Sequence, residues 1–88
     1  MKTEFKASFL KTVKKIENSQ LKTEIANSII NVEAAVNIRQ IKNLKKFKGY
    51  KDYYRIRIRN FRIGIKIEAN TVYFVDIAHR KYIYRLFP

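Results

Sequence analysis

The sequence predicts a small α+β domain in which a helical hairpin packs on one face of an antiparallel sheet, in the order βααβββ. Two patterns predict it: apolar residues recur at helical intervals over residues 8–36, and they alternate with polar residues over residues 53–68. A third observation concerns continuity. Two glycines and one terminal proline in 88 residues leave no linker or repeat, so we expect residues 1–88 to form a single domain.

The first half of the chain predicts a short edge strand followed by two helices. Residues 2–6 place Phe5 among polar neighbours, as in an edge strand, and Ser8 is positioned to cap the first helix. Ser19 is positioned to cap the second helix after a short turn. The apolar positions are Phe9, Leu10, Val13 and Ile16 in the first helix and Leu21, Ile25, Ile29, Val32 and Val36 in the second.

The second half predicts a basic loop and then a three-stranded meander. Residues 39–51 follow neither period, and we expect Ile41, Leu44 and Phe47 to attach this loop to the core. Segments 53–59, 61–68 and 71–78 are expected to pair as antiparallel hairpins through short turns. The tail, residues 81–88, is expected to form a helical turn or an extended cap.

The alternation in the meander also predicts which side chains face away from the helices. The helices need an apolar surface, and the isoleucines at 56, 58, 63, 65 and 67 provide it. Burying these isoleucines turns Arg55, Arg57, Arg62 and Lys66 to the opposite face. Like charges on neighbouring strands repel one another, and a face that served only for solvation would mix signs. A functional basic face is therefore predicted.

Charge is concentrated in the same half of the chain. The formal net charge is +13, and residues 45–88 hold twelve basic and three acidic side chains against eight and four in residues 1–44. Such an excess fits polyphosphate, an anionic membrane surface or an acidic protein partner, and the plainer interpretation is a solubilising coat. Lys42, Lys45, Lys46 and Lys48 are most simply a solvated loop that can add phosphate contacts.

The composition argues against several kinds of site. Without cysteine there is no disulfide, thiolate zinc site or cysteine nucleophile. His79 is the only histidine, no carboxylates are spaced as a metal-binding pair, and two isolated glycines cannot build a phosphate-binding loop. No segment resembles a signal peptide or approaches the ~18 apolar residues of a membrane-spanning helix. We therefore expect a cytoplasmic protein with no metal, no cofactor and no membrane partner.

Once these kinds of site are excluded, the candidate chemistry is that of the basic side chains. Arg55, Arg57 and Arg62 can clamp consecutive phosphates through forked hydrogen bonds. If the strand period continues past residue 78, Arg80 shares their face, with His79 and Tyr84 at its rim. Histidine can move a proton near neutral pH, tyrosine can stack or donate a hydrogen bond, and arginine can stabilise a charged transition state. A surface histidine and a packing tyrosine are the plainer alternatives.

The order and spacing of these motifs resemble the RelE/ParE superfamily of bacterial and archaeal type II toxins, whose fold is βααβββ with a variable C-terminal segment. The matching motifs are L-K-K-F-K-G at 44–49, Y-R-I-R-I at 54–58, F-R-I at 61–63, I-A-H-R-K at 77–81 and I-Y-R at 83–85. The organisation covers nearly the whole chain, and the motifs occupy residues 44–85.

The resemblance implies an mRNA interferase that cuts messages on the ribosome and is neutralised by a cognate antitoxin. By motif position, Arg55 and Arg57 match the strand pair that binds the RNA backbone, and Arg62 matches the arginine of the next strand. Arg80 matches the arginine that follows the third strand, and Tyr84 matches a C-terminal tyrosine. The expected catalytic residues are Arg62, His79, Arg80 and Tyr84, with His79 as the first candidate for proton transfer and Tyr84 as the second. The expected RNA-binding residues are Lys48, Arg55, Arg57, Lys66 and Lys81.

Three functions stay open. The first is a metal-independent endoribonuclease in which the RNA 2′-hydroxyl attacks the adjacent phosphorus. The second is a ParE-like inhibitor of DNA gyrase without ribonuclease activity, since ParE-like relatives share this fold. The third is a non-catalytic nucleic-acid-binding or protein-binding module. The sequence does not specify the antitoxin family, the codon preference or the oligomeric state.

Overall fold

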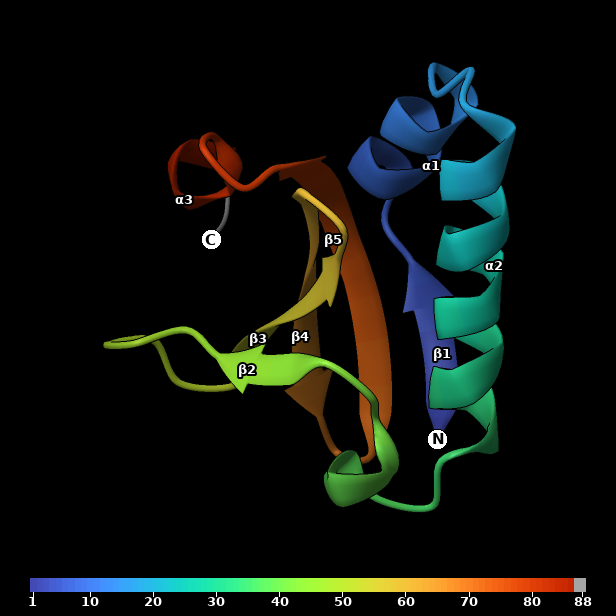
Figure 1. Ribbon diagram of the computed structural model, residues 1–88. Coiled ribbons are helices and arrows are strands. Elements are labelled where there is room, and N and C mark those ends of the chain that lie inside the picture. The colour runs from blue at the N-terminus through green and yellow to red at the C-terminus, as the bar shows by residue number, and fades with distance from the viewer. Residues whose placement is uncertain (87–88) are drawn as a thin grey trace.

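The computed structural model describes residues 1–86 and contains a five-stranded sheet with helices on both sides (Figure 1). The strands are β1 (Lys2–Phe5), β2 (Leu44–Lys46), β3 (Tyr53–Ile58), β4 (Phe61–Glu68) and β5 (Thr71–His79). The helices are α1 (Ala7–Lys14), α2 (Ser19–Ala34), the 3-10 turn η1 (Ile38–Gln40) and α3 (Ile83–Leu86). The spatial order is β1-β5-β4-β3-β2, with β1 parallel to β5 and the other pairs antiparallel. The predicted α+β class and element order are confirmed.

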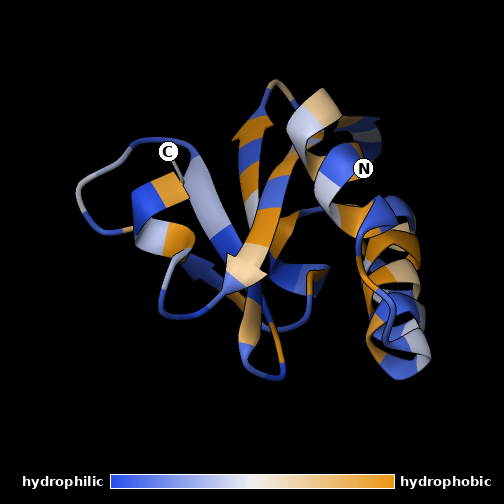
Figure 2. Ribbon diagram, turned by 90° about the horizontal axis from the view of Figure 1, so that it is seen from above, coloured by the Kyte–Doolittle hydropathy of each residue, from blue (hydrophilic) through white to orange (hydrophobic). Residues whose placement is uncertain are grey.

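The main core lies between the sheet and the pair α1 and α2, which cover one face (Figure 1). Ile56, Ile63 and Ile65 are at most 1% exposed and pack with Phe9 and Ile25 from the helices. Orange and blue bands alternate along the strands in Figure 2, as expected for strands whose two faces differ in polarity. Burial of the isoleucine face is therefore the main apolar contribution to stability.

The helix ends differ from those predicted. Lys6, not Ser8, occupies the N-cap of α1, and the Ser8 hydroxyl donates instead to the Val75 carbonyl. Asn18 caps α2, because its side chain accepts a hydrogen bond from the Leu21 amide at 3.0 Å, so Ser19 is the first helical residue. The second helix ends at Ala34, which leaves Val36 outside the helix and 74% exposed.

The segment predicted as a loop, residues 39–51, contains two short elements. Part of it belongs to η1, and β2 pairs antiparallel with β3 through three residues, from Leu44 opposite Ile56 to Lys46 opposite Tyr54. Three residues are too few to produce a recognisable alternation, so only the pairing with β3 reveals this strand.

A β-bulge interrupts the pairing of β4 with β5. Gly64 is opposite Asp76 and Ile65 is opposite Phe74, so Val75 is the extra residue. Two side chains of helix α1 donate hydrogen bonds to the bulge. Thr12 Oγ1 donates to Asp76 Oδ1 at 2.8 Å, and the Ser8 hydroxyl donates to the Val75 carbonyl.

A second, smaller apolar cluster lies on the other face of the sheet. Phe47 from the β2–β3 loop and Ile83 from α3 are at most 2% exposed, and Tyr53, Val75 and Ala78 pack against them. This cluster attaches α3 and the loop to the face that α1 and α2 leave open (Figure 1). No helix within residues 1–86 is long and apolar enough to cross a membrane.

Candidate nucleic-acid interface

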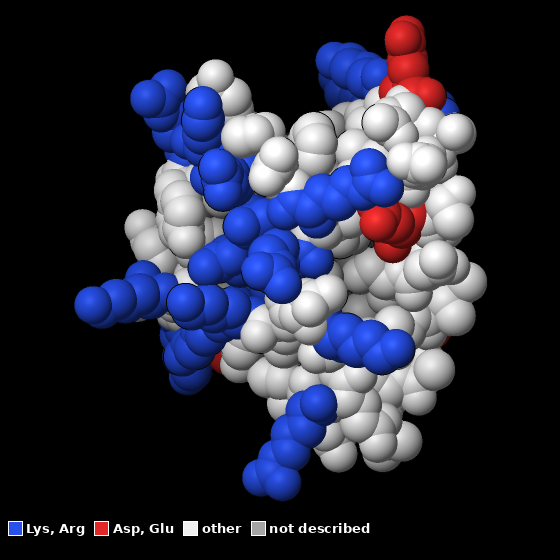
Figure 3. All heavy atoms as spheres, in the orientation of Figure 1, with Lys and Arg blue, Asp and Glu red and all other residues white. Residues whose placement is uncertain are grey.

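Four arginines from three segments meet on the face of the sheet opposite α1 and α2. Arg57 on β3 is directly opposite Arg62 on β4, and the charges of Arg55, Arg57 and Arg80 all act on Arg62. Figure 3 shows lysine and arginine side chains gathered over this part of the molecule, while the visible surface over α2 is mainly uncharged or acidic. We call Arg55, Arg57, Arg62 and Arg80 the arginine cluster.

Arg62 is the most constrained member of the cluster. Its partial burial and the charges of Arg55, Arg57 and Arg80 lower the pKa of Arg62, and interaction with Tyr84 partly offsets this. Its Nη1 donates to the backbone carbonyls of Arg59 at 3.0 Å and Phe61 at 2.9 Å, which fixes one side of the guanidinium.

The cluster carries no internal counter-charge among the described residues. The ion pairs found within residues 1–86 join Arg59 to Glu24 and Lys66 to Glu68, and neither includes a cluster arginine. Guanidinium groups held together without a carboxylate favour an anionic ligand, and their forked geometry matches phosphate.

Tyr84 is the tyrosine that the fold brings to this cluster. Its ring stands edge-on to Phe47 with the centroids 5.3 Å apart, and the side chain is 64% exposed. The neighbouring Ile83 is fully buried in the smaller apolar cluster and fixes the position of α3. Tyr84 therefore lies near enough to Arg62 to offset part of the lowering of the pKa of its guanidinium, and it remains accessible to a ligand.

His79 lies elsewhere. It pairs with Phe61 across β4 and β5, and the two rings are edge-on at 5.7 Å. Phe61 packs against the main core, so strand alternation puts His79 on the helix side of the sheet, away from the arginine cluster. The Lys81 amide donates to its Nδ1 at 3.2 Å, which makes Nδ1 an acceptor. The structure does not bring His79 together with Arg62, Arg80 and Tyr84.

The predicted RNA-binding lysines occupy different surroundings. The hydrogen bond and the charge of Glu68 raise the pKa of Lys66, whose Nζ lies 3.2 Å from the Glu68 carboxylate and 5.5 Å from the centre of the Tyr53 ring. Lys48 is exposed in the β2–β3 loop, and Lys81 is exposed in the turn before α3. Lys66 is thus already paired, whereas Lys48 and Lys81 present exposed side chains.

One further basic residue joins the face by strand pairing. Lys45 on β2 is directly opposite Arg55 on β3, so both side chains project from the same face. The sequence prediction placed Lys45 in a solvated loop, because β2 is too short to identify from its pattern. In the sequence, only the lysines of the L-K-K-F-K-G motif at 44–49 indicate that this segment could contribute to the basic face.

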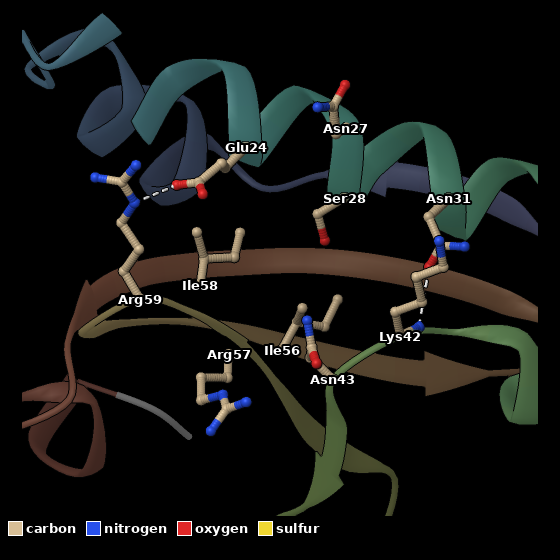
Figure 4. Close-up of a pocket in the computed structure, with 10 residues that line it drawn as sticks. All are labelled: Glu24, Asn27, Ser28, Asn31, Lys42, Asn43, Ile56, Arg57, Ile58 and Arg59. Atoms are coloured by element: carbon tan, nitrogen blue, oxygen red, sulfur yellow. Dashed lines mark hydrogen bonds and ion pairs between the residues drawn. The ribbon is translucent and has the colours of Figure 1, made fainter. Parts of the chain in front are cut away.

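Arg59 follows the sequence parity of Arg55 and Arg57 but turns to the opposite side. Its backbone is in the left-handed region, with φ of 54°, and its side chain pairs with Glu24 at 2.6 Å and with Gln20 at 3.1 Å. This contact closes one end of a groove of about 420 Å³ between α2 and β3 (Figure 4). In Figure 4, Ile56 and Ile58 point towards α2, whereas Arg57 points away from the groove.

Within residues 1–86, no group of three His, Asp or Glu side chains is arranged to hold a metal ion. The chemistry that these residues offer on the basic face is therefore that of guanidinium, ammonium and phenol groups.

Comparisons with known proteins agree with this arrangement. The family described as ParE toxin of the type II toxin–antitoxin system, parDE, matches residues 3–84. The chain is 37% identical to toxin RelE3 of Methanocaldococcus jannaschii over 89 aligned positions, which cover all of both chains.

Solved structures give the same result. The RelB–RelE antitoxin–toxin complex from Methanococcus jannaschii contains a chain 36% identical to this one, with a TM-score of 0.77 over 96% of this chain and 98% of that one. The intact RelBE complex of E. coli, at 20% identity and a TM-score of 0.70 over 89% and 94% of the two chains, supports the fold alone. Family match, curated relative and fold lead to one conclusion: the chain belongs to the RelE/ParE superfamily of type II toxin–antitoxin toxins.

Proposed function

We propose that this toxin is an endoribonuclease that cuts messenger RNA on the ribosome without a metal ion. The observation that carries the proposal is the arginine cluster: Arg62 is surrounded by the charges of Arg55, Arg57 and Arg80, with no ion pair to any of them in the described part of the chain. Holding like charges together costs stability, and a polyanionic substrate offsets that cost when it binds.

In the proposed reaction, the 2′-hydroxyl oxygen attacks the adjacent phosphorus while the bond from phosphorus to the 5′-oxygen breaks. The products are a 2′,3′-cyclic phosphate and a strand with a free 5′-hydroxyl. The proton of the 2′-hydroxyl passes to a base, and the departing 5′-oxygen receives a proton. Arg62 and Arg80 would neutralise the charge that develops on the non-bridging oxygens, and Arg55 and Arg57 would bind the flanking phosphates.

Tyr84 is the better-placed group for proton transfer or for a hydrogen bond to the reacting phosphate. It is exposed and interacts with Arg62, whereas His79 packs against Phe61 on the other side of the sheet. A proton donor or acceptor must come within hydrogen-bonding reach of the reacting oxygens. We therefore assign this role to Tyr84 rather than to His79.

The test is to incubate the purified toxin with a translated message, with and without EDTA, and to determine the chemistry of the new ends. We expect cleavage in EDTA, with 5′-hydroxyl and cyclic-phosphate ends. Cleavage that EDTA abolishes, or products that end in 3′-hydroxyls, would defeat the scheme.

Arginine variants test the assignment of the site. Arg62→Ala and Arg80→Ala should each slow cleavage by about 10²- to 10³-fold, as removal of a transition-state hydrogen-bond donor does elsewhere. The matched control is Arg39→Ala, which removes an exposed arginine on η1 and should leave the rate unchanged. Full activity in both cluster variants would show that the reaction takes place elsewhere.

Inhibition of DNA gyrase is the second candidate, because the family that matches residues 3–84 is named for ParE. Under that function, expression would stall replication and damage DNA while translation continues. Pulse labelling of protein and DNA after induction separates the two: we expect protein synthesis to stop first. An early stop in DNA synthesis with intact messages would favour gyrase.

We also propose a cognate antitoxin as the partner of this chain. The similar solved structures include RelB–RelE and RelBE complexes, in which a related toxin is bound to its antitoxin. An acidic or amphipathic antitoxin segment would cover the helices or the basic face. Co-expression with a small neighbouring reading frame should restore growth and yield a complex that co-purifies.

A further inference from the structure

The loop between β2 and β3 carries an exposed aromatic ring among lysines, and the proposed reaction does not use it. Tyr50 is 51% exposed, and its ring is edge-on to Tyr53 with the centroids 6.5 Å apart. Lys48 and Lys51 flank it and are exposed. Figure 1 shows this loop extending from the sheet on the same side as α3. We call residues 47–52 the lysine arm.

The base of the arm is anchored although its tip is exposed. Phe47 is 2% exposed in the smaller apolar cluster, and its amide donates to the Tyr53 carbonyl at 3.0 Å. The Asp52 carbonyl accepts from the Ile67 amide at 2.9 Å. Between these anchors, Gly49 takes a φ of +83°, which the missing side chain allows, and the turn presents Tyr50 to solvent. A ring held in this way loses little conformational entropy when it binds.

We propose that the lysine arm is a second RNA-contact surface, in which Tyr50 stacks on an unpaired base and Lys48 and Lys51 bind the flanking phosphates. Single-stranded RNA is recognised by aromatic side chains that stack on bases and by cations that follow the backbone. An acidic protein segment would use the lysines but would gain less from a flat, half-exposed ring. The choice of RNA rests on the proposed function. The arm adds affinity to the phosphate contacts of Arg55 and Arg57, whereas Arg62 and Arg80 act on the reacting phosphate.

Fluorescence anisotropy with a short labelled RNA, methylated at its 2′-oxygens so that it cannot be cut, measures this affinity directly. Tyr50→Ala should weaken binding by about 5- to 100-fold, the range for loss of one stacked base, whereas Tyr50→Phe should bind within about twofold of the natural chain. The pair Lys48→Gln and Lys51→Gln should reduce the slope of log affinity against log salt by about 1.4. Lys11→Gln with Lys22→Gln, which removes two exposed lysines from α1 and α2, is the matched control and should not change the slope.

The outcomes separate this inference from the proposed function. The methylated RNA is not a substrate, so a toxin that cuts no message can still show binding through the arm. Conversely, the Tyr50→Ala variant could cut messages normally and with an unchanged KM. That result would overturn the proposal that the arm contacts RNA and would leave the proposed function intact. An equal loss of RNA affinity in Tyr50→Ala and Tyr50→Phe would rule out stacking of the Tyr50 ring on a base. Arm variants that lose affinity for polyglutamate but not for RNA would make the arm a protein-binding surface.

Discussion

At the scale of single residues, the arginine cluster combines a cost in stability with a gain in binding. Arg57 and Arg62 are cross-strand partners of like charge, and burial together with Arg55, Arg57 and Arg80 lowers the pKa of Arg62. The folded state therefore holds Arg62 charged at an energetic penalty. Such penalties are typical of residues kept for binding or catalysis rather than for stability.

Replacing one member of the cross-strand pair should reveal this penalty. Arg57→Gln keeps a polar side chain and removes the repulsion from Arg62, so we expect the free energy of unfolding to rise by about 0.2–1 kcal/mol at low salt. Urea denaturation measures the change, and Arg39→Gln, which removes an arginine outside the cluster, is the control. An unchanged free energy of unfolding in Arg57→Gln would show that the repulsion is negligible, and a lower one would show that favourable contacts of Arg57 outweigh it.

A second prediction at this scale concerns the two groups that can carry a proton. Since His79 lies on the helix side of the sheet, we expect His79→Gln to retain cleavage within a few-fold. Tyr84→Phe keeps the contact with the Phe47 ring but lacks the hydroxyl, and we expect its rate constant to fall by about 10²- to 10⁴-fold. Single-turnover cleavage rates compare the two variants. The reverse order of activities would return the proton-transfer role to His79.

At the scale of elements, α3 is the part of the site that depends on the fewest contacts. A single turn of four residues is not a stable helix by itself, so its position depends on burial of Ile83 in the smaller apolar cluster. That burial places Tyr84 against Phe47 and within range of the charge of Arg62. The site is thus built from a rigid sheet and one weakly attached element.

Truncating the anchor of α3 should therefore abolish activity with little change in the main core. In Ile83→Ala we expect faster amide exchange in residues 80–86 and a loss of cleavage similar to that of Tyr84→Phe. The control is Leu86→Ala on the same helix, where the side chain is 57% exposed and should be dispensable. Hydrogen exchange followed by mass spectrometry reports both effects. Undiminished protection of residues 80–86 in Ile83→Ala would show that other contacts hold the helix.

At the scale of the whole molecule, charge is segregated between the two sides of the sheet. The net charge is +13, and lysine and arginine gather on the face opposite α2 (Figure 3). Self-repulsion of this kind destabilises the compact state and attracts polyanions from a distance. Both effects are screened by salt, over a Debye length of about 10 Å at 0.1 M ionic strength.

Salt should consequently act in opposite directions on stability and on binding. We expect added sodium chloride to raise the melting temperature, because it screens repulsion within the basic face, and to weaken RNA binding, because counterion release contributes less. Differential scanning fluorimetry and anisotropy on the same salt series measure the two trends. Melting temperatures that fall with salt would mean that attractive ion pairs outweigh the repulsion.

The sequence alone determined the α+β class, the order of the elements and the face on which Arg55, Arg57 and Arg62 lie. These features depend on periodicity, which is a local property: an alternation of isoleucine and arginine leaves one arrangement in which the apolar side is buried. The motifs within residues 44–85 likewise indicate the RelE/ParE superfamily, and this prediction is confirmed.

Only the tertiary structure decided which residues past the middle of β5 share that face. Val72 and Phe74 point into the core. Counted from them, an uninterrupted strand would turn His79 towards the arginines and Arg80 away from them, so the prediction that a continuing strand period puts Arg80 on the arginine face was wrong in its reason. The bulge at Val75 inserts one residue and reverses this parity, so that Ile77 and His79 face the helix side. The bulge depends on pairing with β4 and on hydrogen bonds from Ser8 and Thr12, more than sixty residues earlier in the chain. Such long-range contacts leave no periodic trace in the sequence.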